Sequence, residues 1–312
     1  MESTAILFEE PGRIALSSVA LAAPGEADVT VAVEVSGIST GTERLLFTGE
    51  MPAFPGMGYP LVPGYEAVGR IVEAGPASGR RAGERVFVPG SAGFADVRGL
   101  FGASASRLVV PARRAYAVDE ALGADATLIA LAATAYHAVA AFKGEAPELV
   151  VGHGVLGRLA ARIATALGHP APTVWEANAD RRTGGDYSVI APEDDDRRDY
   201  ARILDVSGDS NVLDTLIGRI ARGGEIVLAG FYKDRLGFSF PPAFMREARL
   251  AVAAEWQEAD LLAVRDLVDT GGLSLANLVT GTMPAADASN AYRTAFEDPR
   301  CLKMLIDWSE HA

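Results

Sequence analysis

Cysteine and histidine are scarce in this sequence, and their scarcity limits its chemistry. The single cysteine, Cys301, excludes an internal disulfide and is typical of the reducing cytoplasm. The four histidines lie at positions 137, 153, 169 and 311, so no two share one helical face. A four-cysteine zinc site is therefore impossible, and a mixed site would require distant residues to converge.

Positive charge and long apolar runs are also lacking. Lysine occurs only at positions 143, 233 and 303, and the net charge of −13 argues against electrostatic binding of nucleic acid. The first ten residues (MESTAILFEE) are acidic where an export signal would be basic. No apolar run approaches the ~20 residues of a membrane span. We therefore expect a cytoplasmic protein without integral membrane contact.

What is present is enough apolar sequence for two domains. The chain has 312 residues, of which 49% are hydrophobic and 22% charged, as in an ordinary globular protein. Its first ~120 residues hold short apolar runs, such as residues 29–33, 68–72 and 85–88, separated by turn residues. This pattern predicts a mostly antiparallel β barrel or sandwich.

The second half alternates between strand-like and helix-like runs. Its composition becomes rich in alanine over residues 122–142, which predicts a helix. Strands are expected at residues 149–151, 173–175, 187–190, 203–206, 225–230 and 250–254, with helices at 211–221, 259–269 and 285–296. Such alternation predicts a parallel sheet with crossover helices, an α/β fold. The charged tract 180–199 is expected to be a solvated surface.

Residues 151–168 (VGHGVLGRLAARIATALG) carry the most informative motif. Gly152, Gly154 and Gly157 have the G-x-G-x-x-G spacing that opens a helix after a strand. This spacing permits a tight turn, a close approach to a pyrophosphate and close packing of the helix on the strand. Glu176 follows the next strand, 19 residues after Gly157, where an acidic residue binds ribose hydroxyls. An ordinary glycine-rich turn with an exposed glutamate is the alternative.

The residues near Glu176 bear on the choice of cofactor. Its carboxylate favours NAD, because it repels the 2′-phosphate of NADP. Arg181 and Arg182 follow closely and leave NADP open. Gly230 and Phe231 end a predicted strand at the carboxyl edge of the sheet, where open α/β sheets bind ligands, so we expect both at the cofactor.

A loop in the first half has two interpretations. Residues 46–63 (LFTGEMPAFPGMGYPLVP) combine four prolines and three glycines with large apolar side chains. The loop could be a rigid surface segment folded on itself. It could equally form an apolar wall over a ligand cleft.

Six landmarks in order resemble the medium-chain dehydrogenase/reductase superfamily. They are GI at 37–38 with GTE at 41–43, PGYE at 63–66, VG at 68–69 with VEAG at 72–75, GERV at 83–86, VVP at 109–111, and the glycine motif. The resemblance spans the chain and implies a GroES-like, mostly β barrel over residues 1–121. It implies a Rossmann-type NAD domain over 122–257, a segment 258–312 that returns to the barrel, an active cleft between the domains, and a homo-oligomer.

Departures from the superfamily pattern concern zinc. Zinc-dependent members place a cysteine before the Gly-Thr-acid triplet, where this chain has Thr40 after Ser39. They have histidine in Pro-Gly-His-Glu, where this chain has Tyr65 followed by Glu66. A third ligand would fall where residues 131–134 read LAAT. The resemblance therefore implies a zinc-free member, and we expect no bound metal.

At finer grain, residues 37–66, 97–111 and 152–159 are similar to the 3-hydroxyethyl bacteriochlorophyllide a dehydrogenases of bacteriochlorophyll biosynthesis. That family oxidises a 1-hydroxyethyl group on the tetrapyrrole to acetyl with NAD, and the resemblance implies the same reaction here. Two alternatives stay open. One is a zinc-free quinone or enone reductase that uses NADPH, and the other is a nucleotide-binding protein without catalysis.

Oxidation of an alcohol without a metal requires an acid/base group and hydrogen-bond donors for the reacting oxygen. Tyr65 is the first candidate, as donor or as proton acceptor, unless it merely packs the barrel wall. Glu66 would either relay the proton or brace its loop. Ser39 and Thr40 could bind the substrate hydroxyl or only shape a turn.

Three further residues complete the predicted site. His153, inside the glycine motif, could transfer a proton or touch the cofactor phosphates, since free imidazole titrates near pH ~6.5, or it could only fill space. The resemblance places Thr134 near the nicotinamide carboxamide and Leu156 behind the nicotinamide ring.

Overall fold

The computed structural model describes residues 1–311, which form two compact units. The first unit combines residues 1–130 with the C-terminal segment that begins at Ala276, and the second comprises residues 131–275. The sequence placed these divisions earlier, after residues 121 and 257. The second unit keeps the helix Glu258–Asp269 (α6), so the returning segment begins only after it.

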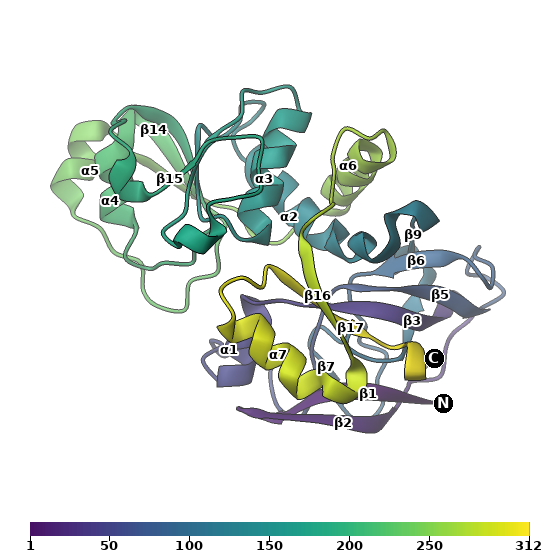
Figure 1. Ribbon diagram of the computed structural model, residues 1–312. Helices are drawn as coiled ribbons and strands as arrows, with labels where there is room; N and C mark the ends of the chain where they lie inside the picture. Colours follow the sequence, from purple (N-terminus) through teal and green to yellow (C-terminus); the bar gives the residue numbers. More distant parts are fainter. Residues whose placement is uncertain (312) are drawn as a thin grey trace. The chain divides into compact units, whose positions relative to one another are not determined.

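The first unit contains two β-sheets (Figure 1). One has the strand order β2-β1-β4-β7, and the other has the order β16-β17-β3-β5-β6-β9 with β8 also paired to β3. The strands are β1 (Glu2–Glu10), β2 (Arg13–Ala20), β3 (Asp28–Ile38), β4 (Leu61–Val62), β5 (Ala67–Ala74), β6 (Arg85–Val88), β7 (Arg98–Gly99), β8 (Arg107–Pro111), β9 (Tyr116–Ala117), β16 (Val279–Pro284) and β17 (Lys303–Asp307). The helices are α1 (Thr42–Thr48), α7 (Ala288–Glu297) and the short 3-10 turns Ala112–Arg114, Glu120–Leu128, Ala285–Asp287 and Ser309–His311.

Strand β17 attaches the C-terminal segment to the first unit. It pairs antiparallel with β3, and β16 pairs parallel with β17, so the yellow strands lie beside purple β3 in Figure 1. Helix α7 adds aromatic packing, because the ring of Tyr292 meets Phe8 edge-on at 5.3 Å. Phe8 also meets Phe47 at 5.7 Å. Phe8 and Tyr292 are fully buried, so their rings exclude water from the interior of the barrel.

The second unit is a six-stranded sheet in the order β12-β11-β10-β13-β14-β15, with every pair parallel. Numbered along the unit, this is the order 3-2-1-4-5-6 of a Rossmann fold. The strands are β10 (Leu149–Val151), β11 (Thr173–Trp175), β12 (Val189–Ile190), β13 (Tyr200–Asp205), β14 (Ile220–Leu228) and β15 (Arg249–Val252). The helices are α2 (Ile129–Ala140), α3 (Val155–Ala166), α4 (Leu213–Arg219), α5 (Phe240–Arg246) and α6, with 3-10 turns Ala179–Arg181 and Pro192–Asp194.

Helix α3 follows β10 directly and buries one face. Leu159, Ile163 and Ala164 are fully buried, as their helical spacing predicts. The helix closes at Gly168, whose φ of +85° suits glycine. A parallel strand order reverses at β10, so the carboxyl ends of β10 and β13 form the switch point at which such sheets bind ligands.

One stretch contradicts the expectation that no run could span a membrane. Residues Glu120–Ala140 are long and apolar enough by length and composition alone. In the structure they form a 3-10 segment followed by α2, and Gly123 breaks the first part at φ +49°. The core helix of a globular protein passes the same test, and 56% of this window is buried.

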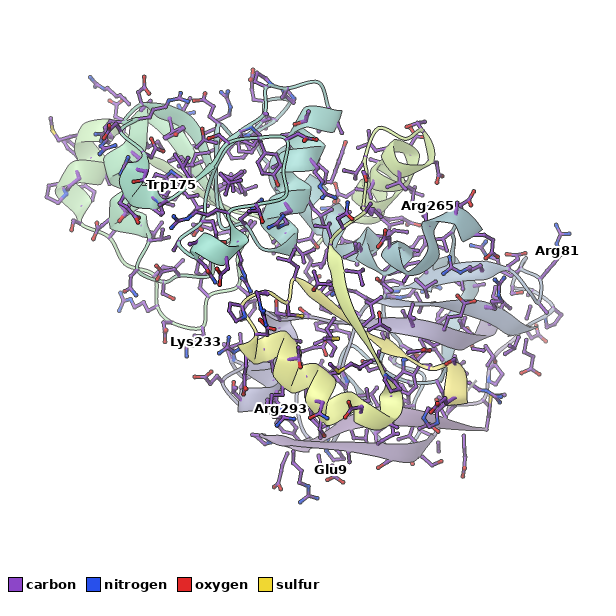
Figure 2. The ribbon with its side chains drawn as sticks, in the orientation of Figure 1. Glu9, Arg81, Trp175, Lys233, Arg265 and Arg293 are labelled. Carbon is purple, nitrogen blue, oxygen red and sulfur yellow. The ribbon has the colours of Figure 1, made fainter. Side chains whose placement is uncertain are left out.

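The acidic tract is less uniformly solvated than its composition predicts. Asp195 is buried and accepts hydrogen bonds from the indole of Trp175 and the hydroxyl of Tyr200, both at 2.7 Å. Trp175, labelled in Figure 2, ends β11 among the side chains of the second unit. Asp195 thus fastens the otherwise exposed tract to the sheet.

Candidate active site

The glycine motif has the geometry of a diphosphate cradle. Gly152 turns the chain at φ +102°, a conformation that disfavours other residues. A Cβ on Gly157 would lie 1.9 Å from the carbonyl oxygen of Gly152, whereas one on Gly154 would point into open space. Gly154 caps α3 without a side chain, so the first N–H groups of that helix stay available to an anion. These residues fit a dinucleotide.

Glu176 lies beside this cradle, directly after β11. One carboxylate oxygen accepts the backbone N–H of His153 at 3.1 Å, and the other accepts that of Asn178 at 2.8 Å. A carboxylate has further lone pairs, so the two ribose hydroxyls can still be bound. The structure therefore places Glu176 where the motif predicts it.

The remaining predicted cofactor residues lie on several elements of the second unit. Thr134 is half-buried in α2, and Leu156 is half-buried at the second position of α3. Gly230 follows β14 and packs close to the backbone of Gly208. A Cβ on Gly230 would lie 2.9 Å from the backbone nitrogen of Gly208. Phe231, next in sequence, is 51% exposed.

Asp205 is a buried carboxyl at the switch point that the sequence did not single out. It ends β13 and accepts the hydroxyl of Tyr232 at 2.7 Å and the N–H of Ser207 at 2.9 Å. Burial raises the pKa of Asp205. The signal that could have found Asp205 is its position as the one acid in the apolar strand predicted at residues 203–206.

His153 is fully buried and both of its ring nitrogens are occupied. Nδ1 lies 2.6 Å from the carbonyl oxygen of Arg181, and Nε2 lies 2.9 Å from the hydroxyl of Tyr187. Burial lowers the pKa of His153, which keeps the ring neutral. These contacts favour a positioning role over the proton transfer considered from the sequence.

In the first unit, Tyr65 donates a hydrogen bond to Ser39 Oγ at 2.7 Å. Burial, and next the charge of Glu66, raise the pKa of Tyr65 far above its ordinary value. The phenol therefore keeps its proton, which favours the donor role over the acceptor role. Ser39 is buried, whereas Thr40, the next residue in the chain, is exposed.

Glu66 is fully buried and forms an ion pair with Lys303, which is 1% exposed. The second carboxylate oxygen, Oε1, has no hydrogen-bond partner among the described residues. The pairing favours the bracing role of Glu66, because Lys303 lies on β17 and Glu66 directly precedes β5. Gly37 completes this packing, since a Cβ there would lie 2.2 Å from Glu66 Oε2.

A second buried carboxyl, Glu43, lies at the start of α1. It accepts the backbone N–H of Ser39 at 2.9 Å and the hydroxyl of Tyr292 at 2.7 Å. Burial raises the pKa of Glu43 to about 7. Glu43 thus orients the turn that carries Ser39.

Sequence reasoning named neither Glu43 nor Lys303 as a site residue. Lys303 begins an apolar run, and a lysine so placed in a buried strand requires a partner. That signal predicts a buried acid without saying which one. Glu43 was visible only as the last residue of a superfamily landmark.

Two predicted features concern ligands. The loop 46–63 packs partly on the barrel, with Leu46 and Met51 buried and Phe54 39% exposed, which favours a segment folded on its own unit.

No group of three or more histidine, cysteine or acidic side chains suited to a metal occurs in residues 1–311.

Comparison with known proteins assigns this arrangement to a family. The alcohol dehydrogenase GroES-like domain matches residues 25–120. The chain is 55% identical over 314 residues to the 2-desacetyl-2-hydroxyethyl bacteriochlorophyllide A dehydrogenase of Cereibacter sphaeroides, with 99% of each chain covered. The chain belongs to this family. Its counterpart in Rhodobacter capsulatus is 52% identical over 312 residues, again with 99% of each covered.

Solved structures agree with the fold. The structure of an alcohol dehydrogenase from E. coli CFT073 in complex with NADH has a TM-score of 0.81 and 21% identity, covering 98% of this chain and 99% of that one. Membership places the protein in the medium-chain dehydrogenase/reductase superfamily, as an oxidoreductase acting on an alcohol with a nicotinamide cofactor. The predicted fold class, a Rossmann-type sheet with a GroES-like β barrel, is confirmed.

Proposed function

We propose that this protein oxidises the 3-(1-hydroxyethyl) group of a bacteriochlorophyllide to the 3-acetyl group, with NAD as cofactor and without a metal. The observation that carries the proposal is the 55% identity, over 99% of both chains, to a dehydrogenase named for this substrate. When bound, NAD accepts the hydride from the carbinol carbon. The chain must then bind the hydroxyl and release its proton.

The Tyr65–Ser39 pair supports the second task. Because Ser39 Oγ accepts the proton of Tyr65, the hydroxyl proton of Ser39 points away from Tyr65. It can donate a hydrogen bond to the substrate oxygen and stabilise that oxygen as the substrate hydroxyl loses its proton. Tyr65 remains the donor of this hydrogen bond at every physiological pH, because the pKa of its hydroxyl is raised. Both hydroxyls of the pair donate and Glu66 is held by Lys303, so the substrate proton passes to a solvent water as the hydride leaves.

The donor set supports the absence of a catalytic metal. Ser39, Thr40 and Tyr65 present hydroxyl groups, whereas zinc in proteins prefers thiolate, imidazole and carboxylate ligands. The nearby carboxyls do not substitute for these, because Glu43 and Glu66 are both buried and engaged with Tyr292 and Lys303.

NAD rather than NADP is proposed from Glu176. Its carboxylate is fixed beside the cradle, and a 2′-phosphate would bring further negative charge against it. Arg182, one of the two arginines that could anchor a phosphate, instead donates to the carbonyl oxygens of Glu176 and Ala177, both at 2.7 Å.

The test is turnover. The purified protein is incubated with 3-(1-hydroxyethyl) bacteriochlorophyllide a and NAD, and NADH and the acetyl product are measured. Product formation supports the proposal. Folded protein that binds NADH but forms no product contradicts the substrate. Reduction of quinones or enones with NADPH would favour the reductase, and cofactor binding without any hydride transfer would favour a non-catalytic protein.

We also propose that the protein is a homo-oligomer. Strand β15 is the edge of the six-stranded sheet, and Val252 on it is 78% exposed. Helix α5 exposes Phe240, Phe244 and Met245 by 66–72%, beside a hollow of about 380 Å³. An open edge and an apolar patch together favour association. Light scattering should give a mass above that of one chain, and Val252→Lys should lower this mass. A monomeric wild type contradicts the proposal.

The cytoplasmic location stays a prediction.

A further inference from the structure

Residues 177–187 form a loop, here called the clamped loop, that two buried polar side chains hold against the glycine motif. His153 is fully buried and Arg158 is 5% exposed, although neither is apolar. His153 belongs to the motif and Arg158 to α3. The loop is therefore tied to the two elements that form the diphosphate cradle.

The ring of His153 is held in one tautomer. A carbonyl oxygen can only accept, so the 2.6 Å contact with Arg181 requires the proton on Nδ1. Nε2 then has only its lone pair and accepts the hydroxyl of Tyr187 at 2.9 Å. The two rings also meet edge to face, at 5.6 Å and 84°. The histidine thus joins the middle of the clamped loop, at Arg181, to its last residue, Tyr187.

Arg158 supplies the second attachment. Its guanidinium donates to the carbonyl oxygens of His153 at 3.1 Å, Gly184 at 3.0 Å and Arg181 at 3.1 Å. Gly184 must be glycine for this contact, because its φ is +86° and a Cβ would lie 2.7 Å from the guanidinium. Backbone carbonyls of the loop are thus satisfied by a charged donor that cannot deprotonate.

The clamp determines what surrounds the ribose-binding carboxylate. Glu176 is pinned from the His153 side, and the guanidinium of Arg182 is turned back on the carbonyl oxygens of Glu176 and Ala177. Admitting a 2′-phosphate would require the carboxylate to retreat and an arginine to turn outward. Both movements act against the clamp, because the carbonyl oxygen of Arg181, next to Arg182 in the chain, is held by His153 and Arg158. Hydrogen bonds to such a group are costly to leave unmade.

We propose that His153 is a positioning residue which, through Tyr187 and together with Arg158, holds the clamped loop in the arrangement that selects NAD over NADP. This inference rests on the proposed use of NAD and deepens it. It assigns cofactor selectivity to a hydrogen bond that does not touch the cofactor, in addition to the carboxylate that does.

The experiment removes that hydrogen bond from each side. Tyr187→Phe removes the donor, and His153→Asn removes the acceptor while keeping an amide donor for the carbonyl oxygen of Arg181. Dissociation constants for NADH and NADPH are measured by fluorescence titration in the absence of substrate. Tyr200→Phe is the matched control, because it removes another buried tyrosine hydroxyl of the same unit, bonded to Asp195.

Each single variant should lower the ratio of the NADPH to the NADH dissociation constant about fivefold, the effect of one buried hydrogen bond. The double variant should resemble the singles, because both remove the same bond. Tyr200→Phe should lower thermal stability and leave the ratio unchanged. An unchanged ratio in Tyr187→Phe, with lost stability alone, overturns the proposal.

Failure of this inference and failure of the proposed function give different results. A wild type that binds NADPH more tightly than NADH overturns both the choice of NAD and the selectivity of the clamp. A wild type that prefers NADH but does not turn over bacteriochlorophyllide overturns the substrate and leaves the clamp supported or refuted by the binding ratios alone.

Discussion

Lys303 and Glu66, 237 residues apart in the chain, form an ion pair in the interior of the first unit. Both residues are at most 1% exposed. Burial raises the pKa of Glu66 and Lys303 opposes that rise. The pair joins the C-terminal strand β17 to the residue that follows Tyr65, so it connects the folding of the C-terminal segment to the geometry of the candidate site.

Lys303→Met should lower the free energy of unfolding by about 3–5 kcal/mol near pH 8, because it leaves a buried carboxylate without its partner. The loss should shrink toward pH 4, where Glu66 is protonated in both the folded and the unfolded chain. Urea denaturation at several pH values measures this. The double variant Glu66→Met with Lys303→Met should recover much of the loss, and equal losses in the single and double variants would contradict the pairing.

Tyr65→Phe should lower kcat by up to about 10²–10³-fold, the range for loss of one donor at a reacting oxygen, because Tyr65 no longer directs the Ser39 proton to that oxygen. The KM for NAD should not change. Because the pKa of Tyr65 is raised, the wild-type rate should show no phenol ionisation up to about pH 10. Steady-state kinetics of Tyr65→Phe and the control Tyr200→Phe test this, and near wild-type turnover in Tyr65→Phe would refute the assignment.

Glu43 should make the protein less stable as pH rises. Its pKa is about 7 in the folded chain and near ~4.3 when unfolded, so the folded state holds the extra proton between these values. Stability from this group is therefore full below about pH 4 and is lost by about pH 7, amounting to ~3 kcal/mol. Glu43→Gln should lack this loss. The free energy of unfolding of the wild type and of Glu43→Gln is measured from pH 5 to 9. The same pH dependence in both proteins would contradict a raised pKa of Glu43.

Glu176→Ala should weaken NADH binding about tenfold, the effect of losing hydrogen bonds to a charged group. NADPH binding should change less, because the repulsion of the 2′-phosphate is removed at the same time. Titration of both reduced cofactors against the wild type and the variant checks this. Equal weakening of the two would rule out a ribose-binding role.

Removal of metal ions should leave activity unchanged. In the proposed mechanism the hydroxyl groups of Tyr65 and Ser39 take the place of a Lewis acid at the reacting oxygen. Turnover is compared before and after dialysis against a chelator, and zinc content is measured on the same samples. Inactivation by the chelator, reversed by added zinc, would overturn the metal-free mechanism.

Much of the second unit followed from local pattern. Gly152, Gly154 and Gly157 are spaced by the geometry of one turn and one helix, and Glu176 follows the next strand, so short-range rules located them. The start of the helix predicted at residues 122–142 was less accurate, because Gly123 interrupts the first part of that stretch. The first unit was predictable as β structure, since alternation and turns are also local.

The partners of the candidate site residues could not be read from any local pattern. Tyr292 meets Glu43 across 249 residues, and Tyr187 reaches His153 across 34. The sequence left His153 open between proton transfer, contact with the cofactor phosphates and filling space, because its position in the motif does not show what surrounds the ring. Burial and two hydrogen bonds, which exist only after folding, make it a fixed neutral connector.

The sequence by itself therefore determined the fold class and the spacing of the glycine motif, because these depend on residue type and near spacing. Only the tertiary structure decided the protonation and direction of the polar groups. Tyr65 is a donor, Glu66 is a brace and His153 is a clamp because burial and charged partners set their pKa values and hydrogen bonds. Those partners come together only when distant segments of the chain pack within each unit.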